Sequence, residues 1–161
     1  MKTLVVYYSR THTTQKAAEI IADRLGETDE ADIIDLKDNI DRSGVGGYLR
    51  SGRDVVFLKK PKLESLGKEL NSYDQVVVGT PIWAWNMSAP VRSFMTSNKD
   101  ILLTKNVSFF CTMGSSGDTR CFQQMQMISG VEPNVTLSLL TKDVHAKQAF
   151  EQINEFVKKL R

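Results

Sequence analysis

Apolar residues in this chain follow two patterns that alternate from one end to the other. Five short runs are continuously or alternately apolar and have the length of a β-strand. They cover residues 4–8, 32–36, 75–79, 107–111 and 135–139. Between them, apolar residues recur at the three- and four-residue spacing of a helix that is buried on one side. Strands that alternate with helices predict an α/β fold, in which a parallel sheet is covered by helices on both faces.

The five runs differ in how apolar they are, and this difference predicts their order in the sheet. The first, third and fourth are continuous, as expected for central strands that are buried on both faces. The second is short, and the fifth alternates apolar and polar residues, as an edge strand with one solvent-exposed face does. We therefore expect a three-layer sandwich around a five-stranded parallel sheet of order 2-1-3-4-5, formed by a single domain over residues 1–161.

Helical spacing predicts the segments that connect these strands. We expect helices at residues 15–25, over Leu63, Leu66 and Leu70, from Pro90 onward, and at 144–160. The connection at 39–61 is irregular, and we expect a short helix within it at about 48–58. A connection this long inside a compact domain is usually functional.

The loop after the first strand is rich in hydroxyl groups at the point where a helix begins. Its hydroxyl residues are Ser9, Thr11, Thr13 and Thr14. A helix N-terminus has free backbone N–H groups, which bind phosphate together with serine and threonine hydroxyls. Helix capping alone is the alternative, but one cap needs only one hydroxyl. We therefore interpret this loop as a phosphate site.

Two further loops follow the third and fourth strands, at the edge where open α/β sheets bind ligands. The second loop contains both tryptophans and consists of Thr80, Pro81, Ile82, Trp83, Ala84, Trp85 and Asn86. The third is rich in glycine, and its candidate ligand residues are Thr112, Met113, Gly114, Gly117 and Asp118. A core role for the tryptophans is the alternative, although flat rings at this edge would stack on a flat ligand. The three loops together predict a site for a phosphorylated planar heterocycle.

With these three loops, the chain resembles the flavodoxin family over essentially its full length, and flavodoxins are the standard example of this strand order. The family's phosphate loop reads Ser/Thr-x-Thr-Gly-x-Thr, and this chain has Ser9, Arg10, Thr11, His12, Thr13 and Thr14 there. The resemblance implies that these residues hold the phosphate of flavin mononucleotide (FMN). It also implies that Trp83 or Trp85 lies beside the flavin ring and that the third loop contacts the pyrimidine end of the ring. The brief connection before the last strand resembles the short-chain branch of the family.

His12 stands where the family's phosphate loop has glycine. If this position requires a positive φ, histidine tolerates it better than most residues do. Arg10 and His12 also give the loop a cationic character.

Composition excludes several classes of function. The net charge of +2 is too small to indicate nucleic-acid binding. No apolar run approaches membrane-spanning length, so we expect no membrane partner, and there is no signal-peptide pattern. The two cysteines lack metal-ligand spacing, and we expect Cys111 to be buried and Cys121 to be a partly exposed thiol. Free thiols without a signal sequence predict a cytoplasmic protein with no metal.

Two functions fit these observations. The first is an electron-transfer protein that receives electrons from a partner reductase. The second is an NAD(P)H-dependent FMN oxidoreductase that acts on quinones or flavins, and whether the chain is an enzyme stays open. No catalytic His, Cys or Ser constellation is visible, and His145 is expected at the surface. We expect a redox protein or NAD(P)H as the partner, and a monomer or weak homodimer.

The segment at 42–62 is strongly basic, with one acidic residue among six lysines and arginines. We interpret it as a solvated basic face. Contact with an anionic partner, such as the pyrophosphate of a nicotinamide nucleotide, is the alternative.

Overall fold

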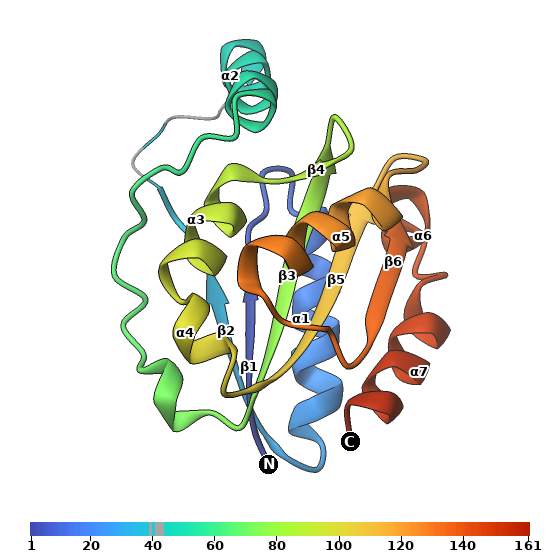
Figure 1. Ribbon diagram of the computed structural model, residues 1–161. Coiled ribbons are helices and arrows are strands. Elements are labelled where there is room, and N and C mark those ends of the chain that lie inside the picture. The colour runs from blue at the N-terminus through green and yellow to red at the C-terminus, as the bar shows by residue number, and fades with distance from the viewer. Residues whose placement is uncertain (39, 41–43) are drawn as a thin grey trace.

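The computed structural model describes residues 1–38, 40 and 44–161 (Figure 1). Its strands are β1 (Lys2–Tyr7), β2 (Glu30–Asp35), β3 (Gln75–Trp83), β4 (Asn86–Met87), β5 (Asn106–Met113) and β6 (Thr136–Leu140). Its helices are α1 (Thr13–Gly26), α2 (Gly44–Val56), α3 (Ala89–Ser97), α4 (Lys99–Leu102), α5 (Asp118–Ser129), α6 (Thr141–His145) and α7 (Phe150–Leu160), together with the 3₁₀ turn η1 (Leu70–Ser72).

The sheet has the order β2-β1-β3-β5-β6, with all four neighbouring pairs parallel. Because β5 and β6 are the fourth and fifth of the predicted strands, the order 2-1-3-4-5 is confirmed, with the two weaker strands at the edges. The sequence analysis did not predict the short strand β4, which pairs antiparallel with the end of β3. This hairpin follows from the unexpected length of β3, which continues to Trp83.

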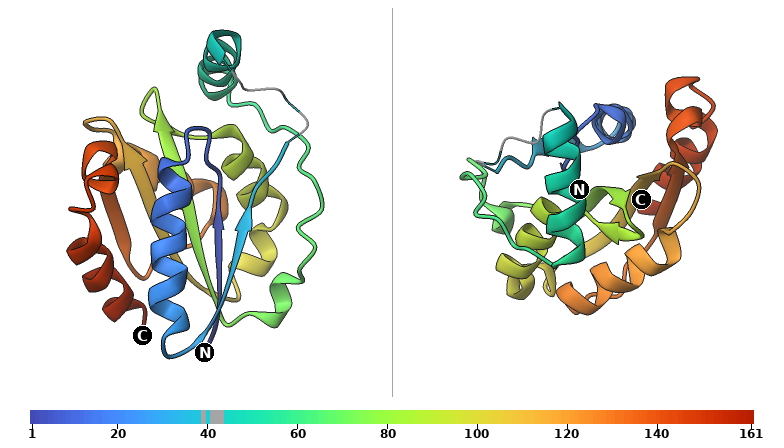
Figure 2. Two further views of the ribbon diagram at one scale, coloured as in Figure 1. Left: turned by 180° about the vertical axis from the view of Figure 1, so that it is seen from behind. Right: turned by 90° about the horizontal axis from the view of Figure 1, so that it is seen from above.

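Two apolar cores lie on opposite faces of the sheet. Helices α1 and α7 cover one face, and α3, α4 and α5 cover the other (Figure 2). Val5, on β1, is buried in the first core, whereas its neighbours Leu4 and Val6 are buried in the second. This alternation is the two-residue period of a strand that is buried on both sides. The three-layer α/β sandwich is therefore confirmed.

The predicted helix over Leu63, Leu66 and Leu70 is wrong, because only η1 is helical in this segment. Leu63 forms an isolated bridge with Asp38, and the Glu64 N–H donates to the Lys37 carbonyl at 2.9 Å. The backbone therefore bonds to the segment after β2 instead of to itself. Both Leu63 and Leu66 still pack against the core, so a three-residue spacing arises here in an extended strap.

The predicted C-terminal helix is divided in two. Helix α6 ends at His145 and α7 begins at Phe150, with Lys147 between them at φ 62°. A left-handed residue cannot continue an α-helix, so the chain changes direction there. Helix α2 was expected at about 48–58 and instead begins at Gly44.

Cys121 is fully buried, as Cys111 is, so the expectation of a partly exposed thiol is wrong for Cys121. It lies one helical turn before Met125 on the inner face of α5, where both residues pack into the core. Burial raises the pKa of the Cys111 thiol to about 12, and it also raises the pKa of Cys121. Both thiols are therefore protonated at neutral pH and are poor nucleophiles.

Candidate functional site

The predicted phosphate loop leads directly into the N-terminus of α1. His12 precedes the helix at φ 61°, ψ 0°, which is the left-handed conformation that glycine adopts without strain. The His12 side chain does not cap the helix, and its Nδ1 instead pairs with Gln15 Oε1 at 2.8 Å. The first turn of α1 carries no acidic residue. Its amide N–H groups therefore remain an anion site that no local side chain neutralises.

The loop hydroxyls divide into three environments. Thr13 and Thr14 are only 4% and 1% exposed, whereas Thr11 is exposed. Thr14 Oγ1 hydrogen-bonds to Thr112 Oγ1 at 2.8 Å, which joins the first loop to the third. Ser9 Oγ is buried and has no hydrogen-bond partner in the described part of the chain. A buried hydroxyl without a partner is costly, so Ser9 is the residue here that most needs a ligand.

His145 contacts the phosphate loop, which the sequence analysis did not predict. Its side chain is exposed, as expected, but its Nε2 lies 2.9 Å from Thr13 Oγ1, across 132 residues of the chain. When Nε2 carries a proton it donates to Thr13, and the Thr13 hydroxyl is then free to donate to an anion. No spacing or motif in the sequence links these two residues, because the contact depends on how α6 packs beside α1.

Arg10 joins the phosphate loop to the long connection, because its Nη2 donates to the Gly44 carbonyl at 3.1 Å. Folding also brings carboxylates beside the loop. A hollow of about 330 Å³ is lined by Ser9 and Arg10 together with Asp35, Asp38 and Glu64. Burial raises the pKa of the Asp35 carboxyl, against the lowering effect of nearby Lys37 and His12. Carboxylates that lie far from the loop in the sequence therefore line this hollow, together with the side chain of Lys37.

The two tryptophans occupy different environments. Trp83, at the end of β3, packs against the core and meets the Tyr8 ring edge-on at a centroid distance of 5.7 Å. Trp85 is 59% exposed in the turn between β3 and β4. Ala84 and Trp85 have φ values of 46° and 60°, the conformation of a tight hairpin turn that is normally made with Asn or Gly. Of the two, Trp85 is the more available to a ligand.

Asn86 and Thr80 support this turn from behind. Asn86 Nδ2 donates to the Ala84 carbonyl at 2.6 Å, and Asn86 Oδ1 accepts a bond from Gln124 Nε2. Thr80 is fully buried, and its Oγ1 accepts the Ser88 N–H at 2.9 Å. These two predicted site residues are therefore occupied in holding the loop.

The third loop lies against the second. Gly117 has φ 114°, and a Cβ at this position would lie 3.0 Å from Cδ1 of Trp85, so only glycine allows the close approach. Asp118 accepts a hydrogen bond from Ser138 Oγ at 2.7 Å, and the Met113 carbonyl accepts one from Thr141. The Gly114 backbone has open space beside it. The second and third loops thus converge as predicted.

A pocket of about 390 Å³ lies between α2 and the tryptophan loop. Its lining residues are Leu49, Ser51, Gly52 and Arg53 of α2 with Ile82, Trp83 and Ala84 of the second loop. This volume falls within the range of small-molecule sites. The prediction that the 39–61 connection is functional is consistent with this position, although residues 39 and 41–43 lie outside the described residues.

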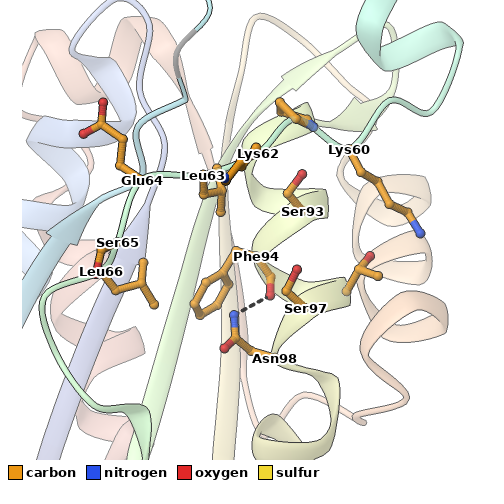
Figure 3. A pocket seen from close by; sticks show the side chains of 12 residues that line it. Lys60, Lys62, Leu63, Glu64, Ser65, Leu66, Ser93, Phe94, Ser97 and Asn98 are labelled. Atoms are coloured by element: carbon orange, nitrogen blue, oxygen red, sulfur yellow. Dashed lines mark hydrogen bonds between the residues drawn. The ribbon is translucent and has the colours of Figure 1, made fainter.

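A second hollow, of about 480 Å³, lies away from the loops, between α3 and the strap at 60–66 (Figure 3). Lys60 and Lys62 border it, and Phe94 contributes to its floor. None of the predicted site residues lines this hollow.

Across the described residues, no group of three His, Cys, Asp or Glu side chains could hold a metal ion. No described helix is both long and apolar enough to span a bilayer.

Comparison with known proteins places the chain in a family. The model of the flavodoxin domain matches residues 49–134, which is more than half of the chain. The chain belongs to the flavodoxin family. The matched range includes the second and third loops of this flavodoxin-family protein but not its phosphate loop. A search of curated proteins finds no match.

Solved structures with the same fold are distant in sequence. A flavoprotein of Lactobacillus acidophilus, solved in complex with FMN, is 20% identical, with a TM-score of 0.71 over 91% of this chain and 97% of that one. Oxidised flavodoxin 1 of Bacillus cereus is 16% identical, with a TM-score of 0.58 over 99% and 97%. Rubredoxin oxygen:oxidoreductase of Desulfovibrio gigas is 18% identical, with a TM-score of 0.66 over 99% of this chain but only 35% of its own. At these identities the likeness supports the fold alone.

Proposed function

We propose that this protein binds FMN at the carboxyl edge of its sheet and transfers electrons through it. The observation that carries the proposal is Ser9 Oγ, a buried hydroxyl without a partner among the described residues, in the loop that leads into the uncapped N-terminus of α1. A phosphate at this point would accept hydrogen bonds both from this hydroxyl and from the helix N–H groups. In support, a neighbour in fold is described as a complex with FMN.

The residues of the three loops fit the parts of FMN. Ser9, Thr11 and Thr13 would hold the phosphate, with Thr14 positioning the loop through Thr112. The pocket between α2 and Trp83 would take the flavin ring. The exposed side chain of Trp85, in the adjoining turn, would stack on the ring from outside this pocket. The backbone at Gly114 is open to the pyrimidine end of the ring. Bound FMN supplies the one- and two-electron chemistry, and the protein orients the ring and limits its contact with water.

We propose an electron-transfer role with a separate reductase as the primary function. The alternative, an NAD(P)H-dependent oxidoreductase, is favoured by Arg53, an exposed guanidinium that borders the pocket and could bind a pyrophosphate. A cytoplasmic location forms part of the proposal, because two free thiols suit a reducing compartment.

Two measurements test this function. Purified protein mixed with FMN should bind one flavin per chain, and the absence of stoichiometric binding would refute the proposal. The loaded protein is then mixed anaerobically with NADH or NADPH, without added reductase. Bleaching of the flavin absorbance within seconds would identify an oxidoreductase. If bleaching requires a separate reductase, the electron-transfer role is supported.

A further inference from the structure

Helix α2 exposes an apolar face at one end of the molecule. It stands apart from the three layers, beyond the edge of the sheet where the ligand loops lie (Figure 1). Val45 and Leu49 are 78% and 67% exposed, and Val56 and Phe57 are 62% and 69% exposed. Because Val45, Leu49 and Val56 recur at helical spacing, they lie on one side of α2, where Leu49 also lines the pocket beside the tryptophan loop. Exposure of several neighbouring apolar side chains to water is unfavourable, and it indicates a surface that binds a partner.

The opposite side of α2 faces the body of the protein. Gly47, Ser51, Asp54 and Val55 are all buried there. Apart from Val55, the described side chains on this buried side are small or polar, whereas Val45, Leu49 and Val56 on the other side are large, apolar and exposed. The helix is therefore built to bind something beyond the protein's own core.

Positive charge surrounds this apolar face. Between residues 44 and 62, the basic residues are Arg50, Arg53, Lys59, Lys60 and Lys62. The only acidic residue in this range is Asp54, which is buried with its carboxylate 3.4 Å from Arg53. The solvent-facing charge of the segment is therefore entirely positive, so the partner must carry negative charge.

Charge and area disfavour two kinds of partner. A second copy would bring two such basic segments together, and like charges would oppose the contact. A 13-residue helix is about 20 Å long and about 10 Å wide. The projected face of the helix is therefore roughly 200 Å², so a stable protein interface of roughly 800 Å² of buried surface per partner would have to extend well beyond α2. A lipid surface has no such requirement, since each apolar side chain that enters it contributes separately.

We propose that α2 and the basic run that follows it bind an anionic membrane surface, with the helix lying in the plane of the bilayer. Val45, Val56 and Phe57 would enter the acyl boundary, while the flanking lysines and arginines contact lipid phosphates. The expectation of no membrane partner rested on the absence of a spanning segment, which an in-plane helix does not need. This inference stands independently of flavin binding, although docking would bring the pocket between α2 and the tryptophan loop to the lipid surface.

The test is co-sedimentation of the whole protein with phosphatidylcholine vesicles, with and without phosphatidylglycerol. Two variants address the surface without touching the pocket: Val56→Ser with Phe57→Ser, and Lys59→Glu with Lys60→Glu. The matched controls are Leu103→Ser with Met127→Ser, which are exposed apolar residues on other faces, and Lys142→Glu with Lys159→Glu. We expect binding only to anionic vesicles, weakened by high salt, and a roughly tenfold or larger loss of affinity in each α2 variant but not in the controls.

Absence of binding to anionic vesicles would overturn the proposal, as would equal losses in the α2 variants and the controls. Light scattering of the same samples tests whether the face binds a second copy of the chain instead. If the unchanged protein is a dimer and the Val56→Ser/Phe57→Ser variant is a monomer, the face contacts a second copy. This result too would overturn the proposal. Flavin content is measured in parallel. Vesicle binding by protein that takes up no FMN would refute the proposed function and leave this inference standing.

Discussion

The phosphate loop and helix α2 lie at the same end of the molecule but are built in opposite ways. In the loop, Thr13 and Thr14 turn inward and bond to residues 132 and 98 positions away. In α2, the large apolar side chains of Val45 and Val56 turn outward and are mostly exposed to solvent. The loop is thus positioned by the packed protein before any ligand arrives, whereas the outer face of α2 gains its contacts only from a partner. The first arrangement suits tight binding of one fixed group, and the second suits a reversible surface contact.

The largest expected effect tests whether the loop carries the binding energy. FMN should bind at least 100-fold more tightly than riboflavin, because the phosphate accepts several charge-assisted hydrogen bonds worth about 1.5–3 kcal/mol each. Isothermal titration calorimetry of both ligands measures the difference. Equal affinities would show that the loop is a helix cap and that the comparison with α2 is mistaken.

A pair of glycine substitutions compares the packing of the sheet, at Gly79 of β3, with the packing of α2, at Gly52. A Cβ at Gly79 would lie 2.0 Å from the Phe110 ring, so Gly79→Ala should lower the free energy of unfolding by about 3 kcal/mol. A Cβ at Gly52 in α2 meets no atom within 4 Å. Gly52→Ala should therefore be neutral or stabilise by up to about 1 kcal/mol through helix propensity. Urea denaturation measures both, and a large loss at Gly52 would contradict the open packing of α2.

Removing one loop hydroxyl should weaken FMN binding by about 1.5–3 kcal/mol. Thr13→Val keeps the shape of the side chain and removes the hydroxyl that pairs with His145. Thr28→Val is the control, since the Thr28 hydroxyl donates to the Asp29 carboxylate on the exposed surface after α1. Flavin fluorescence titration compares the two variants. Loss of affinity in both, or in neither, would remove Thr13 from the phosphate site.

The two tryptophans should differ in their contribution to stability, because Trp83 packs against the core and Trp85 is exposed. Trp83→Ala removes contacts with Tyr8 and the core, so it should lower the free energy of unfolding by about 1–2 kcal/mol. Trp85→Ala should change it by less than about 0.5 kcal/mol, because the side chain is 59% exposed. The Trp85 variant should still weaken flavin binding by about 0.5–1.5 kcal/mol through lost stacking. Thermal denaturation and flavin titration together check these expectations, which a large stability loss at Trp85 would contradict.

The ion pair between Lys68 and Asp32, which lies outside both regions, should make the smallest contribution to stability. Hydrogen bonds from Lys68 and then Tyr73 lower the pKa of the Asp32 carboxyl. Because this pKa is lower in the folded than in the unfolded protein, the contribution is present above about pH 4 and disappears as the pH falls through the folded value. Asp32 is about a third exposed, so the contribution should stay below about 1 kcal/mol. Asp32→Asn, measured by urea denaturation at pH 7 and pH 3, should show a larger loss at pH 7 than at pH 3.

Local pattern in the sequence determined the sheet, its strand order and its three ligand loops. Continuous runs such as 75–79 and 107–111 require burial on both faces, which fixes them at the centre. The loop from Ser9 to Thr14 is likewise a local feature, because strand, hydroxyl residues and helix follow one another directly. Apolar spacing misled where a strap imitates a helix, at Leu63 and Leu66, since burial repeats there without local hydrogen bonds. It also predicted one C-terminal helix where the structure has α6 and α7.

Tertiary structure alone decided which of these residues meet. His145 hydrogen-bonds to Thr13 across 132 residues of the chain, and Gly117 approaches Trp85 from another loop. Cys121 is fully buried only because other elements pack against its helix. The exposure of the outer face of α2 was likewise decided by the tertiary structure. Its apolar spacing can be read from the chain, but burial on the opposite side depends on how the whole domain packs. Sequence periodicity records that one face of a helix is apolar, and only the fold determines whether that face is covered.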